Sequence, residues 1–145
     1  PWTDLSTVPD LTLLRDAIRM LRERNMEEEI ALLHFGGIRS GTDVAKSLAM
    51  NCTASVIGAA MGFAAGGAGD GDSMVFPEAA AVSDLEASMV NWIKATAQEA
   101  AIIARCTGKT NVHNLEPEDM RTITLAAHRD LGIPLASGQH RREAF

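Results

Sequence analysis

The sequence is poor in the residues that several common classes of protein need. It has no tyrosine, four phenylalanines and two tryptophans, and its 13 lysines and arginines are outnumbered by 19 aspartates and glutamates. This deficit of aromatic and positive residues argues against a nucleic-acid surface, which needs clustered lysine and arginine. No apolar run reaches the ~20 residues of a membrane-spanning helix. We therefore expect neither nucleic acid nor a membrane as a partner.

The two cysteines, Cys52 and Cys106, have no close cysteine or histidine neighbour in the sequence. Zinc and iron–sulfur sites use such neighbours, so we expect no metal site and no cluster ligated by this chain alone. We expect both thiols to be buried and unpaired. Free thiols suit a reducing compartment and predict a cytoplasmic location. Because the first residue is Pro1 rather than Met, we expect a processed chain or a piece of a longer one.

The apolar residues, 46% of the chain, suffice for a core and are arranged with helical and strand periodicity. A helical stripe after Asp10 predicts a helix that ends near Asn25. The apolar run 30–35 predicts a parallel strand covered on both faces. Ser40 or Thr42 can start the next helix, and residues 55–57 predict a second strand. This order is typical of parallel βα repeats.

The second half of the sequence predicts helices after a glycine-rich connector. A capping box at residues 83–86 predicts the start of a long helix that ends at Gly108. Pro117 is suited to the first position of a last helix, which Gly132 ends. We expect βα units in residues 1–66, the connector in 67–82 and a helical region in 83–145.

The loop after the first strand is the best candidate for binding chemistry. Loops at the carboxyl ends of parallel strands form the active face of α/β folds. The backbone amides of Gly36 and Gly37, a helix start and the Arg39 guanidinium suit a phosphate group, with Gly58 and Ala59 as a second set of amides. The same glycines would also suit ordinary tight turns, so spacing alone leaves both interpretations open.

Two single histidines also have alternative interpretations. His34, beside the glycine pair, could meet a substrate or a cofactor, although a hydrogen-bonded core histidine is the more common case in such an apolar run. We expect His113 to hydrogen-bond the turn before the last helix.

Residues 35–50 and 55–60 resemble the last two βα units of the flavin mononucleotide (FMN) barrels of the glutamate synthase family. Residues 98–120 include the run Gly-Lys-Thr-Asn-Val-His-Asn-Leu-Glu-Pro-Glu-Asp at 108–119. This part resembles the tail of a branch of that family that includes N-methylglutamate synthase, the methylamine–glutamate N-methyltransferase. The resemblance implies an α/β fold: the C-terminal βα units of a TIM (β/α)8 barrel followed by a helical tail.

The resemblance also implies a cofactor, partners and an activity. FMN would be held through its phosphate by five residues, Gly36, Gly37, Arg39, Gly58 and Ala59. Because a barrel takes at least ~200 residues, another polypeptide or segment would complete it, in a hetero-oligomer. The implied activity is N-methylglutamate formation from glutamate and methylamine through an imine and reduced flavin. Reductive glutamate synthesis from 2-oxoglutarate and a non-catalytic scaffold subunit are the alternatives, and no catalytic residue is assigned.

Overall fold

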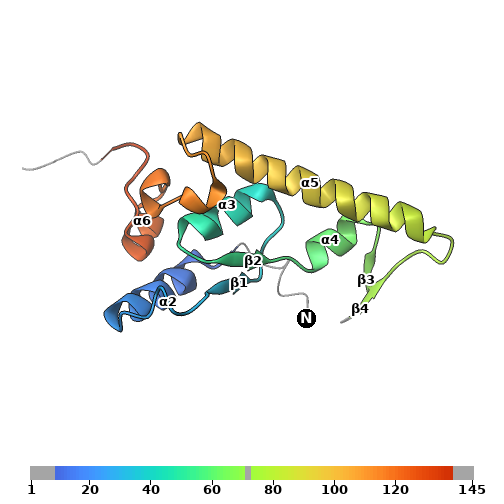
Figure 1. Ribbon diagram of the computed structural model, residues 1–145, viewed down its shortest axis with the longest axis horizontal. Helices are drawn as coiled ribbons and strands as arrows, with labels where there is room; N and C mark the ends of the chain where they lie inside the picture. Colours follow the sequence, from blue (N-terminus) through green and yellow to red (C-terminus); the bar gives the residue numbers. More distant parts are fainter. Residues whose placement is uncertain (1–8, 71–72, 139–145) are drawn as a thin grey trace, which may run out of the picture.

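A computed structural model describes residues 9–70 and 73–138 of the chain. The three predicted regions together span residues 1–145. The parts of those regions at residues 1–8, 71–72 and 139–145 lie outside the described residues. These residues form helices and two small sheets (Figure 1). The elements, in chain order, are α2 (Leu11–Glu23), β1 (Leu33–Phe35), α3 (Gly41–Ala49), β2 (Ala54–Val56), α4 (Ala59–Ala64), β3 (Ala68–Asp70), β4 (Ser73–Val75), α5 (Val82–Cys106), the 3₁₀ turns η1 (Val112–Asn114) and η2 (Pro117–Asp119), and α6 (Leu125–Leu131).

The predicted βαβ order is confirmed in the first half. Strands β1 and β2 pair in parallel, with Phe35 opposite Val56, and α3 connects them. Capping side chains begin the helices where the sequence predicted. The Asp10 carboxylate accepts from the amides of Thr12 and Leu13 at α2, and Ser40 is the N-cap of α3. Asn51 leaves α3 in the left-handed conformation, with φ 68°.

Helix α3 lies between the β1–β2 sheet and the long helix α5 (Figure 1). Small residues at the contact let the two helices approach closely, since Ala45, Ala49, Ala100 and Ala104 form one buried cluster with Leu115. A second buried cluster joins α2 to the end of α3 and to the chain after α6; its members are Leu14, Leu48, Met50, Cys52, Leu131 and Ile133. The core therefore draws on both the predicted βα region and the helical region.

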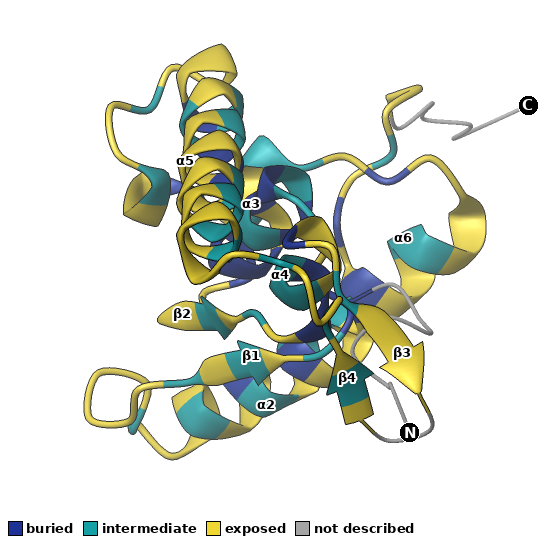
Figure 2. Cartoon of the chain, turned by 90° about the vertical axis from the view of Figure 1, so that its right-hand side faces the viewer, coloured by how far each residue is buried: buried dark blue, intermediate teal, exposed yellow. Residues whose placement is uncertain are grey.

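The β1–β2 sheet is covered on one face only. His34 faces α3, where its ring contacts the Ser47 hydroxyl. On the opposite face Leu33, Phe35 and Val56 are 58%, 62% and 40% exposed, and exposed residues line both strands in Figure 2. The prediction of a strand covered on both faces is thus wrong for the described residues, because no described element packs against this face. Each strand also has only one neighbour within the part of the chain described here.

The glycine-rich connector contains an antiparallel pair of short strands, β3 and β4. Two predictions about helices in the second half need correction. Helix α5 begins at Val82 with Ala81 as N-cap, so Ser83 is not a cap. The amides of Asp84 and Leu85 both donate to the Ala81 carbonyl, which starts the helix earlier than the polar signal suggested.

The predicted last helix is divided in two. Pro117 begins η2 as expected, with reciprocal Glu116–Asp119 capping. The chain then becomes extended, because the Thr122 amide donates to the Pro134 carbonyl and the Thr122 carbonyl accepts from the Ala136 amide. An extended residue cannot continue a helix, so α6 starts afresh after the N-cap Thr124. It ends at Gly132 in the left-handed conformation, as predicted.

The predictions for the two cysteines have different outcomes. Both cysteines are free, and Cys52 is buried as expected, whereas Cys106 near the end of α5 is exposed. The expectation for Cys106 is wrong because Cys106 follows the buried Ala104 by two residues, and that spacing puts two residues on nearly opposite sides of an α-helix. Across residues 9–70 and 73–138, no helix combines the length and the apolar character needed to cross a membrane.

Candidate functional site

The carboxyl ends of β1 and β2 form one edge of the parallel sheet. Gly36 and Gly37 directly follow β1, with φ of 116° and 71°. L side chains rarely adopt these left-handed values, so the glycine pair is required by this turn. The pairing of Phe35 with Val56 brings the two strand ends side by side. Gly58, the N-cap of α4, therefore lies at the same edge as the glycine pair.

The loop between β1 and α3 has one inward and one outward side chain. Ile38 is only 2% exposed and holds the loop in the core. The Arg39 amide donates to Asp43 Oδ2 at 3.1 Å. Arg39 Nε lies 3.8 Å from the same oxygen, with the arginine side chain 45% exposed. Asp43 thus lies beside Nε of the Arg39 guanidinium, and the arginine side chain remains partly exposed to solvent.

The first turn of α3 is bound by a carboxylate from another helix. Glu99 of α5 accepts a hydrogen bond of 2.8 Å from the Gly41 amide through one oxygen. Its other oxygen accepts from the Thr42 hydroxyl. Both bonds lower the pKa of Glu99 below its ordinary value, and the bond from the Thr42 hydroxyl has the larger effect. The Gly41 amide is therefore satisfied within the protein, and the expected anion contact at this helix start is reduced to the loop before it.

Four of the five predicted contact residues lie in the two loops of this edge, and the fifth, Ala59, is the first residue of α4. Gly36, Gly37 and Arg39 follow β1, while Gly58 and Ala59 begin α4, where Ala59 is buried. A Cβ built on Gly36 meets no atom within 4 Å, so there is open space beside the turn. Open space, glycine turns and a partly solvated guanidinium fit a phosphate monoester. Their role as phosphate contacts stays a prediction.

Glu99 and Asp43 were not identified as site residues from the sequence. Glu99 lies 58 residues from its partner Gly41, so local spacing carried no signal for this contact. Asp43, in contrast, is four residues after Arg39. An acid at that spacing in the first turn of a helix is a recognisable signal for an ion pair.

His34 and Lys109 each have a polar partner within the protein. His34 Nδ1 lies 2.7 Å from Ser47 Oγ. Partial burial lowers the pKa of His34. The ring is hydrogen-bonded as expected, but it is half-buried rather than part of the core. Lys109 Nζ lies 2.9 Å from Glu116 and 3.5 Å from Asp119. The pKa of Lys109 is raised, and the hydrogen bond to Glu116 is the largest cause.

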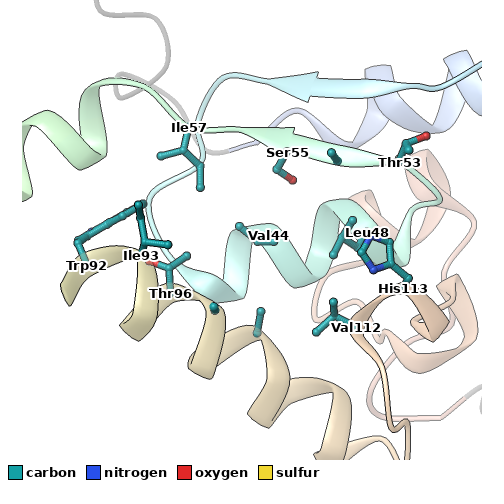
Figure 3. A pocket seen from close by; sticks show the side chains of 13 residues that line it. Val44, Leu48, Thr53, Ser55, Ile57, Trp92, Ile93, Thr96, Val112 and His113 are labelled. Atoms are coloured by element: carbon teal, nitrogen blue, oxygen red, sulfur yellow. The ribbon is translucent and has the colours of Figure 1, made fainter. Parts of the chain in front are cut away.

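The turn at η1 is held differently from the prediction. Asn111, rather than the His113 ring, caps it, by accepting from the His113 amide at 3.0 Å. The His113 side chain instead lines a cavity of ≈ 320 Å³ beside β2 (Figure 3). Apolar side chains from α3 and α5, among them Val44, Leu48, Trp92 and Ile93, form most of its wall. This cavity is separate from the glycine loop.

Residues 9–70 and 73–138 contain no group of three or more histidine, cysteine, aspartate or glutamate side chains that could hold a metal ion.

The geometry defines a candidate anion-binding edge in a mixed helix and strand structure, and comparisons with known proteins point to a particular family. Residues 2–69 match the family model described as the conserved region in glutamate synthase. The chain is 32% identical over 158 residues to a "Glutamate synthase large subunit-like protein" of Rhizobium meliloti (strain 1021). Both matches support a glutamate synthase-related family for this chain.

The extent of these matches is also informative. The alignment with the Rhizobium protein covers 89% of this chain but 36% of that protein, so the chain spans about a third of the relative's length. The family match ends at residue 69, before α5 begins. No solved structure matches the chain.

Proposed function

We propose that this chain is the FMN-phosphate-binding C-terminal part of a glutamate synthase-type enzyme, in which it forms the last βα units of a TIM barrel. One observation carries this proposal: two left-handed glycines and Arg39 lie at the carboxyl edge of a parallel strand pair, next to Gly58. That edge is where barrel enzymes place phosphate sites, after their last strands. The glutamate synthase matches supply the class of enzyme.

The residues of this chain would hold the cofactor rather than perform the bond changes. The Gly37 and Ala59 amides and the Arg39 guanidinium would bind the phosphate, and Asp43 would orient the arginine through Nε. Bound FMN would supply hydride chemistry at the α-carbon of an amino acid. We propose N-methylglutamate synthesis as the reaction: glutamate and methylamine give N-methylglutamate and ammonia. The tail motif at residues 108–119 supports this branch. Within the motif, Lys109 forms an ion pair with Glu116.

We further propose that another polypeptide or segment supplies the rest of the barrel. The uncovered face of Leu33, Phe35 and Val56 supports this, because soluble proteins seldom leave such residues and free strand edges in water. The relative, of which the chain spans about a third, is long enough to contain those strands. A cytoplasmic location is proposed from the free cysteines.

The decisive experiment is flavin binding by the native assembly that contains this chain. We expect a yellow protein whose FMN dissociates about tenfold or more readily in Arg39→Ala, since a charged hydrogen bond contributes about 1.5–3 kcal/mol. Arg105→Ala is the matched control, because Arg105 is an exposed arginine at the far end of α5. An assembly without flavin absorbance, or an Arg39→Ala variant that binds FMN like wild type, would refute the proposed site.

Product analysis separates the two enzyme reactions. N-methylglutamate formed from glutamate and methylamine without an added reductant supports the proposed branch. Reductant-dependent glutamate formation from 2-oxoglutarate supports a reductive glutamate synthase instead. If the assembly lacks flavin and Arg39→Ala leaves partner binding and activity unchanged, the chain is a scaffold subunit.

A further inference from the structure

We propose that Glu99 is a positioning residue for the anion-binding loop, so that helix α5 is part of the site. This inference rests on the proposed function, because the anion is the FMN phosphate. The family match ends at residue 69, so it does not include Glu99. The structure nevertheless connects Glu99 directly to the residues that follow Arg39.

The first step of the argument is the two-point contact. The two oxygens of Glu99 accept from the Gly41 amide and the Thr42 hydroxyl, which are consecutive residues at the start of α3. A carboxylate held at two points fixes both the position and the rotation of that first turn. Arg39 stands two residues earlier, with Ser40 between them as N-cap. The loop therefore joins a turn whose place is set by α5.

The second step is the close approach of the two helices at this point. A Cβ at Gly41 would lie 2.6 Å from Glu99 Cβ and 2.7 Å from the Ala100 amide nitrogen, closer than real Cβ atoms come. The turn of α5 that carries Glu99 thus packs directly on the turn of α3 that carries Gly41. Movement of α5 would move the start of α3 and with it the Arg39 loop.

The third step is the division of labour between two carboxylates. Asp43 orients Arg39 from within α3, whereas Glu99 acts across the helix interface. Neither acid is needed to fold its own helix, since α5 has its N-cap elsewhere and α3 has Ser40. Their shared property is that each binds a backbone amide of the segment 39–41. The two acids therefore hold the backbone on both sides of Ser40, Asp43 at residue 39 and Glu99 at residue 41.

The test uses the native assembly and two readouts. Amide hydrogen exchange in residues 36–43 reports the loop itself, and the FMN dissociation constant reports its function. For Glu99→Ala, which removes both hydrogen bonds, we expect exchange about tenfold faster in that segment. FMN binding should be about five- to tenfold weaker, because only part of the contribution of the two bonds is transmitted to the phosphate contacts. Glu99→Gln keeps acceptor oxygen and should recover part of both. Thr42→Val removes only one of the two bonds and should give a smaller effect.

Two controls separate positioning from general destabilisation. Leu115→Ala opens the same α3–α5 core away from the loop, and Glu86→Ala removes an exposed acid of α5. The inference is refuted if Glu99→Ala leaves loop exchange at the wild-type rate, or if Leu115→Ala weakens FMN binding as much as Glu99→Ala does. Should wild type bind no FMN, the proposed function fails, while the exchange measurement still decides whether Glu99 fixes the loop.

Discussion

Gly41→Ala is the substitution for which the structure makes the most definite prediction. The added methyl group would overlap the Thr96 carbonyl oxygen and approach the Ala100 amide nitrogen to 2.7 Å. Both are backbone atoms of α5, so a side-chain rotation cannot relieve the overlap. Helix α5 must shift, or the start of α3 must.

Two opposing effects set the magnitude. Forcing an extra methyl group into a packed interface costs about 1–3 kcal/mol. Alanine in place of glycine in a helix recovers up to about 1 kcal/mol. Because the overlap is with backbone atoms, the cost lies in the upper part of the first range, and the net effect is a loss of about 1–2 kcal/mol in the free energy of unfolding. For a chain of this size each kcal/mol lowers the melting temperature by about 2–4 °C, so we expect a decrease of about 2–8 °C.

The assay is thermal unfolding of the purified protein, compared with wild type in the same assembly. Lys46→Ala, at an exposed position of α3, is the control and should stay within about 0.5 kcal/mol of wild type. A Gly41→Ala protein as stable as the control would mean that α5 does not pack on the first turn of α3. That result would also remove the basis for the positioning role of Glu99.

Three further predictions follow from buried groups. Met50→Ala, at a site 2% exposed, should lower the free energy of unfolding by about 2–5 kcal/mol in urea titrations; a loss below 1 kcal/mol would contradict the described core. Burial lowers the pKa of His34, so the unfolded chain takes up the proton more readily and stability falls as the pH drops below about 6.5. His34→Gln should show a smaller loss of melting temperature between pH 7.5 and 5.5, and an unchanged loss would refute this assignment. Maleimide should label exposed Cys106 but not native Cys52, whose pKa burial raises; equal labelling rates would show that Cys52 is accessible.

The sequence predicted best the features that depend on a few neighbouring residues. Asp10, Ser40, Gly108 and Gly132 mark helix ends correctly, because each acts on backbone atoms within a few positions. Ala81 gave no such signal, since a residue without a polar side chain can still begin a helix through its carbonyl alone. The sequence therefore predicts the start of α5 at the capping box of residues 83–86 instead of at Val82.

Contacts between distant segments lay beyond what sequence periodicity could predict. The break between η2 and α6 depends on Thr122 pairing with the chain at Pro134 and Ala136, and the Glu99 contact spans 58 residues. The glycine loop, in contrast, was found because its residues are contiguous. The sequence thus located the candidate site but not the helix that supports it.

The uncovered sheet face limits how the proposed companion segment can bind. Leu33, Phe35 and Val56 are each about half exposed, so covering them would contribute roughly 1 kcal/mol each, since full burial of such a side chain contributes about 1.5–3 kcal/mol. The sum is below the 4–15 kcal/mol that association of separate molecules costs, by common estimates. Covering this face is therefore insufficient, and the companion must also pair with the free edges of β1 or β2.

This argument predicts a graded effect of Phe35→Asp. The substitution places a charge on the face that the companion would cover but leaves the backbone edges intact, so the companion should bind about tenfold more weakly rather than dissociate completely. Titration of the complex by native mass spectrometry measures the change, with Leu13→Asp on the outer side of α2 as the matched exposed control. If Phe35→Asp binds the companion like the control, the β1–β2 face does not point into a completed barrel.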